Sequence, residues 1–173
     1  TDGETYYYAT IVFIQIDHDG NILNQQDVGT TSNYLTPPHK IAQTIIRTED
    51  NGYLITGYGG PVPGSYSRPY SLKLNADLTV VWENYYEGFN TFPTVYTDNY
   101  ESLYAFIGDA IINDDGTYYL WGINIGTIAG AILLIQIDAA GNHIWDTLYR
   151  PSGWIGTVAD QVLRVKRTKD HGF

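Results

Sequence analysis

The sequence predicts an all-β protein in which one unit of about 60 residues is repeated along the chain. The 173 residues include 16 tyrosines and 18 glycines, a composition that favours strands and turns over helices. A segment with the pattern of a β-hairpin occurs three times. A second, shorter element recurs with the same spacing, and a period longer than a single strand is typical of repeat architectures.

The clearest hairpin lies within Ala131–Arg150. Apolar and β-branched residues dominate Ile132–Ile137, and Asp138–Asn142 supplies the residue types that favour a turn. A second apolar segment follows at Ile144–Tyr149. The pattern therefore predicts two antiparallel strands joined by a short turn.

Two upstream segments repeat this hairpin. In the second copy, a strand ending at Leu74 is followed by Trp82, and the same number of residues separates Ile137 from Trp145 in the third copy. The first copy, near the N-terminus, has Asn24 at the corresponding position. We therefore expect Trp82 and Trp145 to occupy equivalent buried positions in adjacent repeats.

A turn element gives the period independently. Arg47–Tyr53 recurs as Arg167–Phe173, and Ile111–Thr117 is an intermediate copy. The spacing of these copies agrees with that of the hairpins, at about 60 residues. Two markers with one period predict a true structural repeat.

Each repeat is expected to contain four short strands, of which the hairpin supplies the third and fourth. The first and second strands are expected at Ile41–Thr48 and Tyr53–Gly57, at Tyr104–Ile112 and Tyr118–Gly122, and, for a first strand alone, at Gln161–Thr168. Glycines and prolines predict a loop over Gly59–Ser65. Long connections are expected at Gly29–Lys40, Gly88–Tyr100 and Pro151–Val158. The apolar spacing in Ile155–Val162 leaves a helix open as the alternative there.

The repeat carries a recognisable motif: an acidic turn with glycine, an apolar strand ending in Asp or Asn, and a following tryptophan. The matching residues are Asp50, Gly52, Tyr53, Leu54, Gly57, Leu74, Asn75, Trp82, Asp115, Gly116, Gly122, Ile137, Asp138, Gly141, Asn142 and Trp145. This pattern resembles a family of tandem β-propeller-like repeats found in secreted and surface proteins of microbes. The resemblance implies blades of four antiparallel strands and an extracellular or cell-surface location. Its motifs specify the blade and no reaction.

The repeats divide the chain into a partial repeat over 1–40, repeats over 41–100 and 101–158, and a partial repeat over 159–173. The chain is expected to be a single β-repeat domain or a segment of a longer propeller. A closed propeller has at least about four blades, so unpaired strand edges are expected. Such edges promote association between chains, which predicts pairing of copies into a ring or a filament.

Composition excludes several kinds of partner. The formal net charge is −10, and the nine Lys and Arg residues are scattered, which argues against nucleic acid. No apolar segment approaches the roughly 20 residues of a membrane-spanning helix. The chain has no cysteine, so disulfides and thiolate metal sites are excluded.

Asp17–Asn21 is the strongest candidate for a metal site. It has the carboxylates of a short calcium loop but lacks the bidentate glutamate of an EF-hand. Asp and Asn also close hairpin turns with their own side chains, and this interpretation is favoured. The histidines show no metal-ligand spacing; they are His18, His39, His143 and His171. We therefore predict no metal, no cofactor and no catalytic residue.

Aromatic residues on the long connections are the candidate ligand-binding residues, because exposed aromatic side chains stack on sugars or anchor protein partners. They are Phe92, Tyr96, Tyr100 and Trp154. Trp82, Trp121 and Trp145 lie in expected strands and are assigned to packing. The predicted function is that of a non-catalytic extracellular or surface repeat protein for adhesion, assembly or ligand display. The alternative is a carbohydrate-binding or glycan-processing module that uses loop aromatics and carboxylates.

Overall fold

The computed structural model describes residues 11–28, 39–60, 68–86, 104–125, 131–149, 164–170 and 172. All regular secondary structure in these residues is β-strand, in ten strands that pair antiparallel. The predicted all-β class with four-stranded, blade-like sheets is thereby confirmed. In the described part of the chain, no helix is long and apolar enough to cross a membrane.

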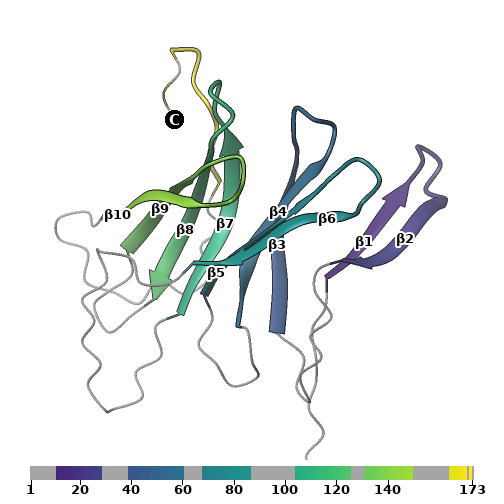
Figure 1. Cartoon of the computed structure of the whole chain (residues 1–173), viewed down its shortest axis with the longest axis horizontal. Helices are drawn as coiled ribbons and strands as arrows, with labels where there is room; N and C mark the ends of the chain where they lie inside the picture. The colour runs from purple at the N-terminus through teal and green to yellow at the C-terminus, as the bar shows by residue number, and fades with distance from the viewer. Residues whose placement is uncertain are drawn as a thin grey trace, which may run out of the picture.

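The strands form three sheets in a row (Figure 1). The N-terminal hairpin pairs β1 (Ile11–Ile16) with β2 (Ile22–Val28). The first blade contains β3 (His39–Arg47), β4 (Tyr53–Gly60), β5 (Arg68–Leu74) and β6 (Val80–Tyr85). The second blade contains β7 (Tyr104–Ile112), β8 (Tyr118–Ile125), β9 (Ala131–Ile137) and β10 (His143–Tyr149). In both blades each strand pairs with its neighbour in sequence.

The three hairpin turns share one backbone conformation. Gly20, Leu78 and Gly141 occupy the corresponding position of each turn, with φ of 86°, 69° and 81°. A left-handed conformation is strained for a residue with a Cβ, so Leu78 is the exception among the three. The shared geometry shows that the hairpins β1–β2, β5–β6 and β9–β10 are structurally equivalent copies of one element.

The second strand of each blade begins as expected but ends three residues later, because β4 continues to Gly60 and β8 to Ile125. The expected loop over Gly59–Ser65 is wrong at its start, because Gly59 and Gly60 still belong to β4. Gly59 pairs with Lys40 of β3, so the expected connection over Gly29–Lys40 is also too long at its end. Backbone pairing across the sheet outweighs the weak strand preference of glycine at these positions.

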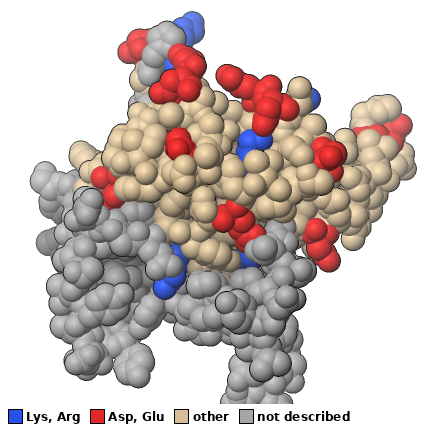
Figure 2. Space-filling view, viewed as in Figure 1, with Lys and Arg blue, Asp and Glu red and all other residues tan. Residues whose placement is uncertain are grey.

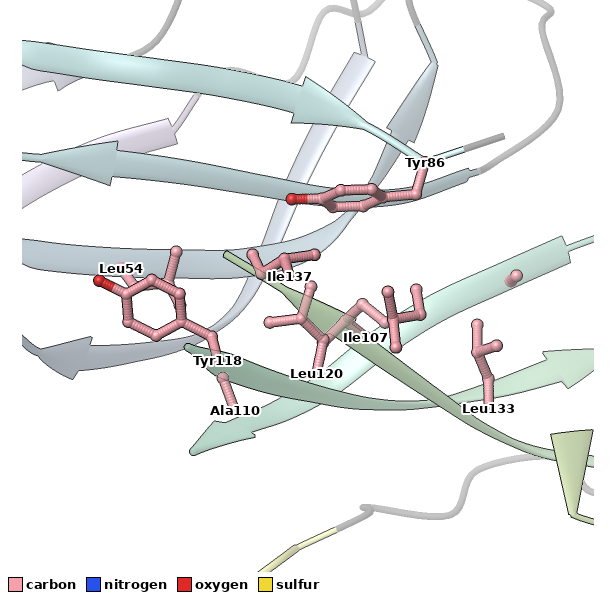
Figure 3. Close-up of a cluster of buried hydrophobic side chains, with 10 residues drawn as sticks. Leu54, Tyr86, Ile107, Ala110, Tyr118, Leu120, Leu133 and Ile137 are labelled. Carbon is pink, nitrogen blue, oxygen red and sulfur yellow. The ribbon is translucent and has the colours of Figure 1, made fainter. Parts of the chain in front are cut away.

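Two apolar clusters join the three sheets. The hairpin–blade core contains Ile11, Phe13, Val28, Ile55, Tyr70, Leu72, Leu74 and Leu78. The blade–blade core contains Leu54, Tyr86, Ala105, Ile107, Ala110, Tyr118, Leu120, Leu133, Ile135 and Ile137. Figure 3 shows Leu54 and Tyr86 of the first blade facing the side chains of the second. Burial between consecutive units therefore holds the row together.

The C-terminal segment contacts the second blade. The buried Asp109 accepts a hydrogen bond from the backbone N–H of Val165 at 2.9 Å, and Arg167 forms an ion pair with Asp114. The turn from Thr168 to Gly172 repeats the backbone hydrogen bond that joins Thr48 to Gly52 in the first blade. However, the residues over 164–168 form no strand, so the expected strand over Gln161–Thr168 is wrong for its described part. The helix alternative over Ile155–Val162 lies outside the described residues.

The two tryptophans are equivalent in position but not in burial. Trp82 pairs with Lys73, and Trp145 pairs with Gln136 at the same point of the second blade. Trp82 is half-buried and packs against the blade–blade core, whereas Trp145 is 37% exposed. The expectation of buried sites is therefore wrong, most clearly for Trp145. The reason is physical: Trp82 faces the next blade, and no described sheet lies over Trp145.

Truncating the two tryptophans should therefore have unequal effects. Trp82→Ala removes packing against the blade–blade core and should cost about 2–3 kcal/mol, below the 3–5 kcal/mol typical of a fully buried aromatic side chain. Trp145→Ala should cost about 1 kcal/mol or less. Denaturant midpoints of the two variants would measure the difference. Equal losses would contradict the assigned packing.

Candidate functional site

Acidic side chains are numerous but dispersed. Figure 2 shows them in separate small groups on the face in view. No group of three or more His, Asp or Glu side chains among the described residues is arranged to hold a metal ion. Most of the described carboxylates instead close turns or pair with lysine and arginine.

Asp17 shows how the turn carboxylates are used. Its Oδ1 accepts hydrogen bonds from the backbone N–H groups of Asp19 at 2.9 Å and Asn21 at 2.8 Å, and its Oδ2 accepts one from the Asn21 side chain at 2.9 Å. Asp138 makes the same three bonds in the second blade. Hydrogen bonds from Asn21 lower the pKa of Asp17, and those from Asn142 lower the pKa of Asp138. The predicted hairpin turn is confirmed at Asp17–Asn21.

Calcium is expected to be dispensable for the fold. The carboxylate oxygens of Asp17 and Asp138 already accept hydrogen bonds from their own turns, and calcium requires six to eight oxygen ligands. A chelator should leave the melting temperature unchanged. A ligand that binds only the native state must stabilise it, so a rise of several degrees on adding calcium would contradict this expectation.

Asp50 and Lys73 form an ion pair that reaches the surface from a buried lysine. Lys73 Nζ donates to Asp50 Oδ2 at 2.7 Å and to Oδ1 at 3.0 Å, and also to the Leu74 carbonyl at 3.0 Å. The Lys73 side chain is buried, whereas that of Asp50 is 59% exposed. The hydrogen bonds from Lys73, and then that from Thr48, lower the pKa of Asp50 to about 2. The pair ties the β3–β4 turn to β5.

Protonation of Asp50 should weaken the native state in acid. A group whose pKa is lowered by folding adds stability above its unfolded pKa, and this stability is lost as the pH falls through the folded pKa. For Asp50 the loss should occur between the ordinary value of 3.8 and about 2. Asp50→Asn should lower the free energy of unfolding at pH 7 by about 1–2 kcal/mol, a value reduced because water screens the exposed carboxylate.

Denaturant unfolding from pH 7 to pH 2 would measure this contribution. Asp50→Asn should flatten the acid limb of the stability profile. In a Lys73→Met background the same substitution should change stability little, because no charged partner remains. An equal loss in both backgrounds would show that the ion pair contributes nothing.

A buried polar cluster on β3, β5 and β6 is the closest approach to a catalytic arrangement. Lys40 Nζ forms an ion pair with Glu83 Oε1, and the two side chains are only 4% and 8% exposed. Lys40 also lies over the Tyr70 ring, 5.8 Å from its centroid. Burial, and then the nearby Glu83 charge, raise the pKa of Tyr70 and of Tyr85. A general acid or base must reach a proton of the substrate, and the Lys40 and Glu83 side chains are too deeply buried to do so. The cluster instead holds strands of the first blade together.

The contact between the two blades is built from strand β6 and the β9–β10 turn. Trp82 Nε1 donates to the Ala139 carbonyl at 3.0 Å, and Asn84 Nδ2 donates to the Gly141 carbonyl at 2.9 Å. The Tyr86 hydroxyl also donates to the Gly141 carbonyl, at 3.3 Å. We call this arrangement the strand–turn contact. The hairpin makes a corresponding contact with the first blade, in which Gln26 Nε2 donates to the Leu78 carbonyl at 2.9 Å.

Apolar side chains are exposed at both ends of the row. On the N-terminal hairpin they are Val12, Ile14 and Ile16, and on β10 they are Trp145 and Tyr149. Ile22, Leu23 and Ile144 are also exposed, but so are Val80 and Val81 at the corresponding positions of the first blade, so these positions do not distinguish the ends. The Trp145 ring lies 5.8 Å from that of Tyr119, on the same face of the second blade. Clustered exposed apolar residues mark interaction sites. These two end faces are the candidate functional surfaces.

The predicted ligand-binding residues are not part of these faces. Phe92, Tyr96, Tyr100 and Trp154 all lie outside the described residues. Sequence reasoning missed the exposure of Ile14 and Trp145. The available signal was the repeat itself, because equivalent positions are buried only where another unit packs against them.

The sequence matches no protein-family model and no curated protein.

Proposed function

We propose that this chain is a non-catalytic repeat module of an extracellular or cell-surface protein, and that it serves adhesion, assembly or ligand display. The observation that carries the proposal is the exposure of apolar side chains at both ends of the row, where Ile14 is 51% and Tyr149 63% exposed. Exposed apolar clusters of this kind suit association with other proteins.

The use of the polar side chains supports a non-catalytic role. The buried Lys40–Glu83 pair is closed to substrates, and Asp17 and Asp138 hold their own turns. The strongly lowered pKa of Asp50 is explained by its partner Lys73 in the fold. Perturbed groups mark active sites when they face a cleft, and here they bridge strands and turns.

One observation favours the carbohydrate-binding alternative. Trp145, Tyr149 and the neighbouring Tyr119 lie on β8 and β10 of the second blade, and Trp145 and Tyr149 are exposed. Flat aromatic side chains on an exposed sheet can stack on sugar rings.

A glycan array would separate the two functions. The proposed protein-contact module should give no sugar-specific signal. Tyr58 on β4 serves as the control, because its ring packs against Phe106 at 5.7 Å and is not part of either end face. A sugar-specific signal that is lost in Trp145→Ala or Trp154→Ala, but retained in Tyr58→Phe, would contradict the proposal and support the alternative. Release of reducing ends from the bound glycan would further identify a glycan-processing enzyme.

A further inference from the structure

Three apolar side chains recur on one face of the third strand of every unit. They are Tyr70, Leu72 and Leu74 in the first blade, Leu133, Ile135 and Ile137 in the second, and Val12, Ile14 and Ile16 in the hairpin. The first two sets are fully buried, whereas the hairpin set is about half exposed. This face of the sheet is therefore covered in both blades and exposed in the hairpin.

The unit that precedes each set in the chain provides the cover. Leu72 packs in the hairpin–blade core with Ile11 and Phe13 of the hairpin. Ile135 packs in the blade–blade core with Leu54 of the first blade. By this rule the open face of the hairpin requires a unit on its other side.

The opposite face of each unit receives the next one. In the first blade, Leu54, Lys73 and Trp82 lie in one row across the sheet, and the second blade covers them. The corresponding row in the second blade consists of Tyr119, Gln136 and Trp145. Trp145 in this row is exposed, whereas Trp82 in the corresponding row of the first blade packs against the second blade.

The side chains in the two observed contacts are matched in size. In the blade–blade contact, the turn residue is Gly141, and a Cβ there would lie 2.7 Å from the Trp82 ring. In the hairpin–blade contact, Asn24 stands in place of the tryptophan, and the turn residue is the buried Leu78. A large residue on the strand, Trp82, is thus combined with glycine in the turn, and a smaller residue on the strand, Asn24, is combined with leucine in the turn. The remaining strand position is Trp145 and the remaining turn position is Gly20, so they too combine a large strand residue with a turn glycine.

We propose that the open face of the hairpin in one copy of this chain docks on the open face of the second blade in another copy. The Gly20 turn lies against Trp145, as the Gly141 turn lies against Trp82. The inference rests on the proposed assembly function and names its partner, a second copy. One interface joins two different faces, so copies associate head to tail and form a ring or a filament.

The strand–turn contact can be reproduced in the docked pair. Trp145 Nε1 takes the place of Trp82 and donates to the His18 carbonyl, the counterpart of Ala139. The hydroxyl groups of Thr147 and Tyr149 take the places of the Asn84 and Tyr86 donors toward the Gly20 carbonyl. The exposed apolar set led by Ile14 supplies the buried area.

Sedimentation velocity of the full 173-residue chain would test the contact. Measurements should span 10 to 200 µM at about 150 mM salt, where charge repulsion between copies is screened. The wild-type chain should associate with increasing concentration. Gly20→Asn should weaken association by about 10- to 100-fold, because the added side chain overpacks a tight contact.

Gly116→Asn is the matched control. Gly116 also has a positive φ, of 78°, and like Gly20 it has no atom within 4 Å of a built Cβ. Asparagine tolerates this conformation, so both variants should fold. Only Gly20→Asn should lose association. Equal behaviour of the two variants would overturn the contact.

A mixing experiment tests the head-to-tail geometry. Ile14→Asp blocks the hairpin face, and Trp145→Asp blocks the face of the second blade. Each variant alone should be monomeric, and the mixture should form a 1:1 dimer that grows no further. A wild-type chain that stays monomeric up to 200 µM would overturn the contact, as would association that survives both substitutions. The proposed function is judged separately, by the glycan array.

Discussion

Gly122→Ala should destabilise the protein by about 3 kcal/mol or more, at the upper end for overpacking in a core. A Cβ at Gly122 would lie 2.0 Å from the Phe106 carbonyl oxygen of the adjacent strand. The clashing atom belongs to the backbone and cannot rotate away. Strand β7 has a register shift at this point, between Ile107 and Asp109, and a bulge brings the strand backbone close to its partner.

The first blade provides an independent test of the same feature. A Cβ added at Gly57 would lie 2.0 Å from the Ile41 carbonyl oxygen, so Gly57→Ala should be comparably destabilising. Gly116→Ala is the control, because its Cβ would meet open space and only the left-handed conformation would cost about 1–2 kcal/mol. Denaturant midpoints of the three variants would be compared. A mild effect at both Gly57 and Gly122 would contradict the close approach.

The hairpins could be predicted because their determinants are local. Asp17 and Asn21 hold the first turn through side-chain and backbone hydrogen bonds within five consecutive residues. Gly20 supplies the left-handed conformation. Such short-range chemistry leaves a readable pattern, and its repetition revealed the equivalent hairpins of both blades.

Strand ends could not be predicted to the same degree. Gly59 and Gly60 have a low preference for strands, yet they extend β4 because β3 pairs with them. The segment over 164–168 repeats a strand sequence but forms no strand in the structure. At Gly59 and Gly60 the pairing with β3 determines where the strand ends. The sequence of one segment does not reveal which strand it will pair with, or whether it will pair at all.

The candidate surfaces could not be predicted from the sequence, because their exposure depends on which repeat packs against which face. Trp82 and Trp145 share a sequence context and a register, but their burial differs because only Trp82 faces another described blade. Lys40 and Glu83 lie on different strands, β3 and β6, and no spacing rule links them. Both features arise from packing between distant segments, which local periodicity cannot report.

Breaking the Lys40–Glu83 pair should also destabilise the protein strongly. Glu83→Leu leaves the Lys40 ammonium group buried without its counter-charge, and removing one partner of a buried pair typically costs about 3–5 kcal/mol. Lys40→Met should have an effect of similar size, because the Glu83 carboxylate then remains buried near Tyr70 and Tyr85. Both side chains are more than nine-tenths buried, so water cannot replace the lost partner.

The double variant Lys40→Met/Glu83→Leu distinguishes the ion pair from simple loss of packing. Replacing both charges with apolar side chains of similar volume is often neutral or stabilising, so the double variant should be more stable than either single variant. The exposed pair of Arg167 and Asp114 is the control, and Asp114→Asn should cost at most about 1 kcal/mol. Denaturant unfolding of all four variants would measure the coupling energy. If the two single losses simply add in the double variant, the charges do not interact, and the interior of the first blade depends on packing alone.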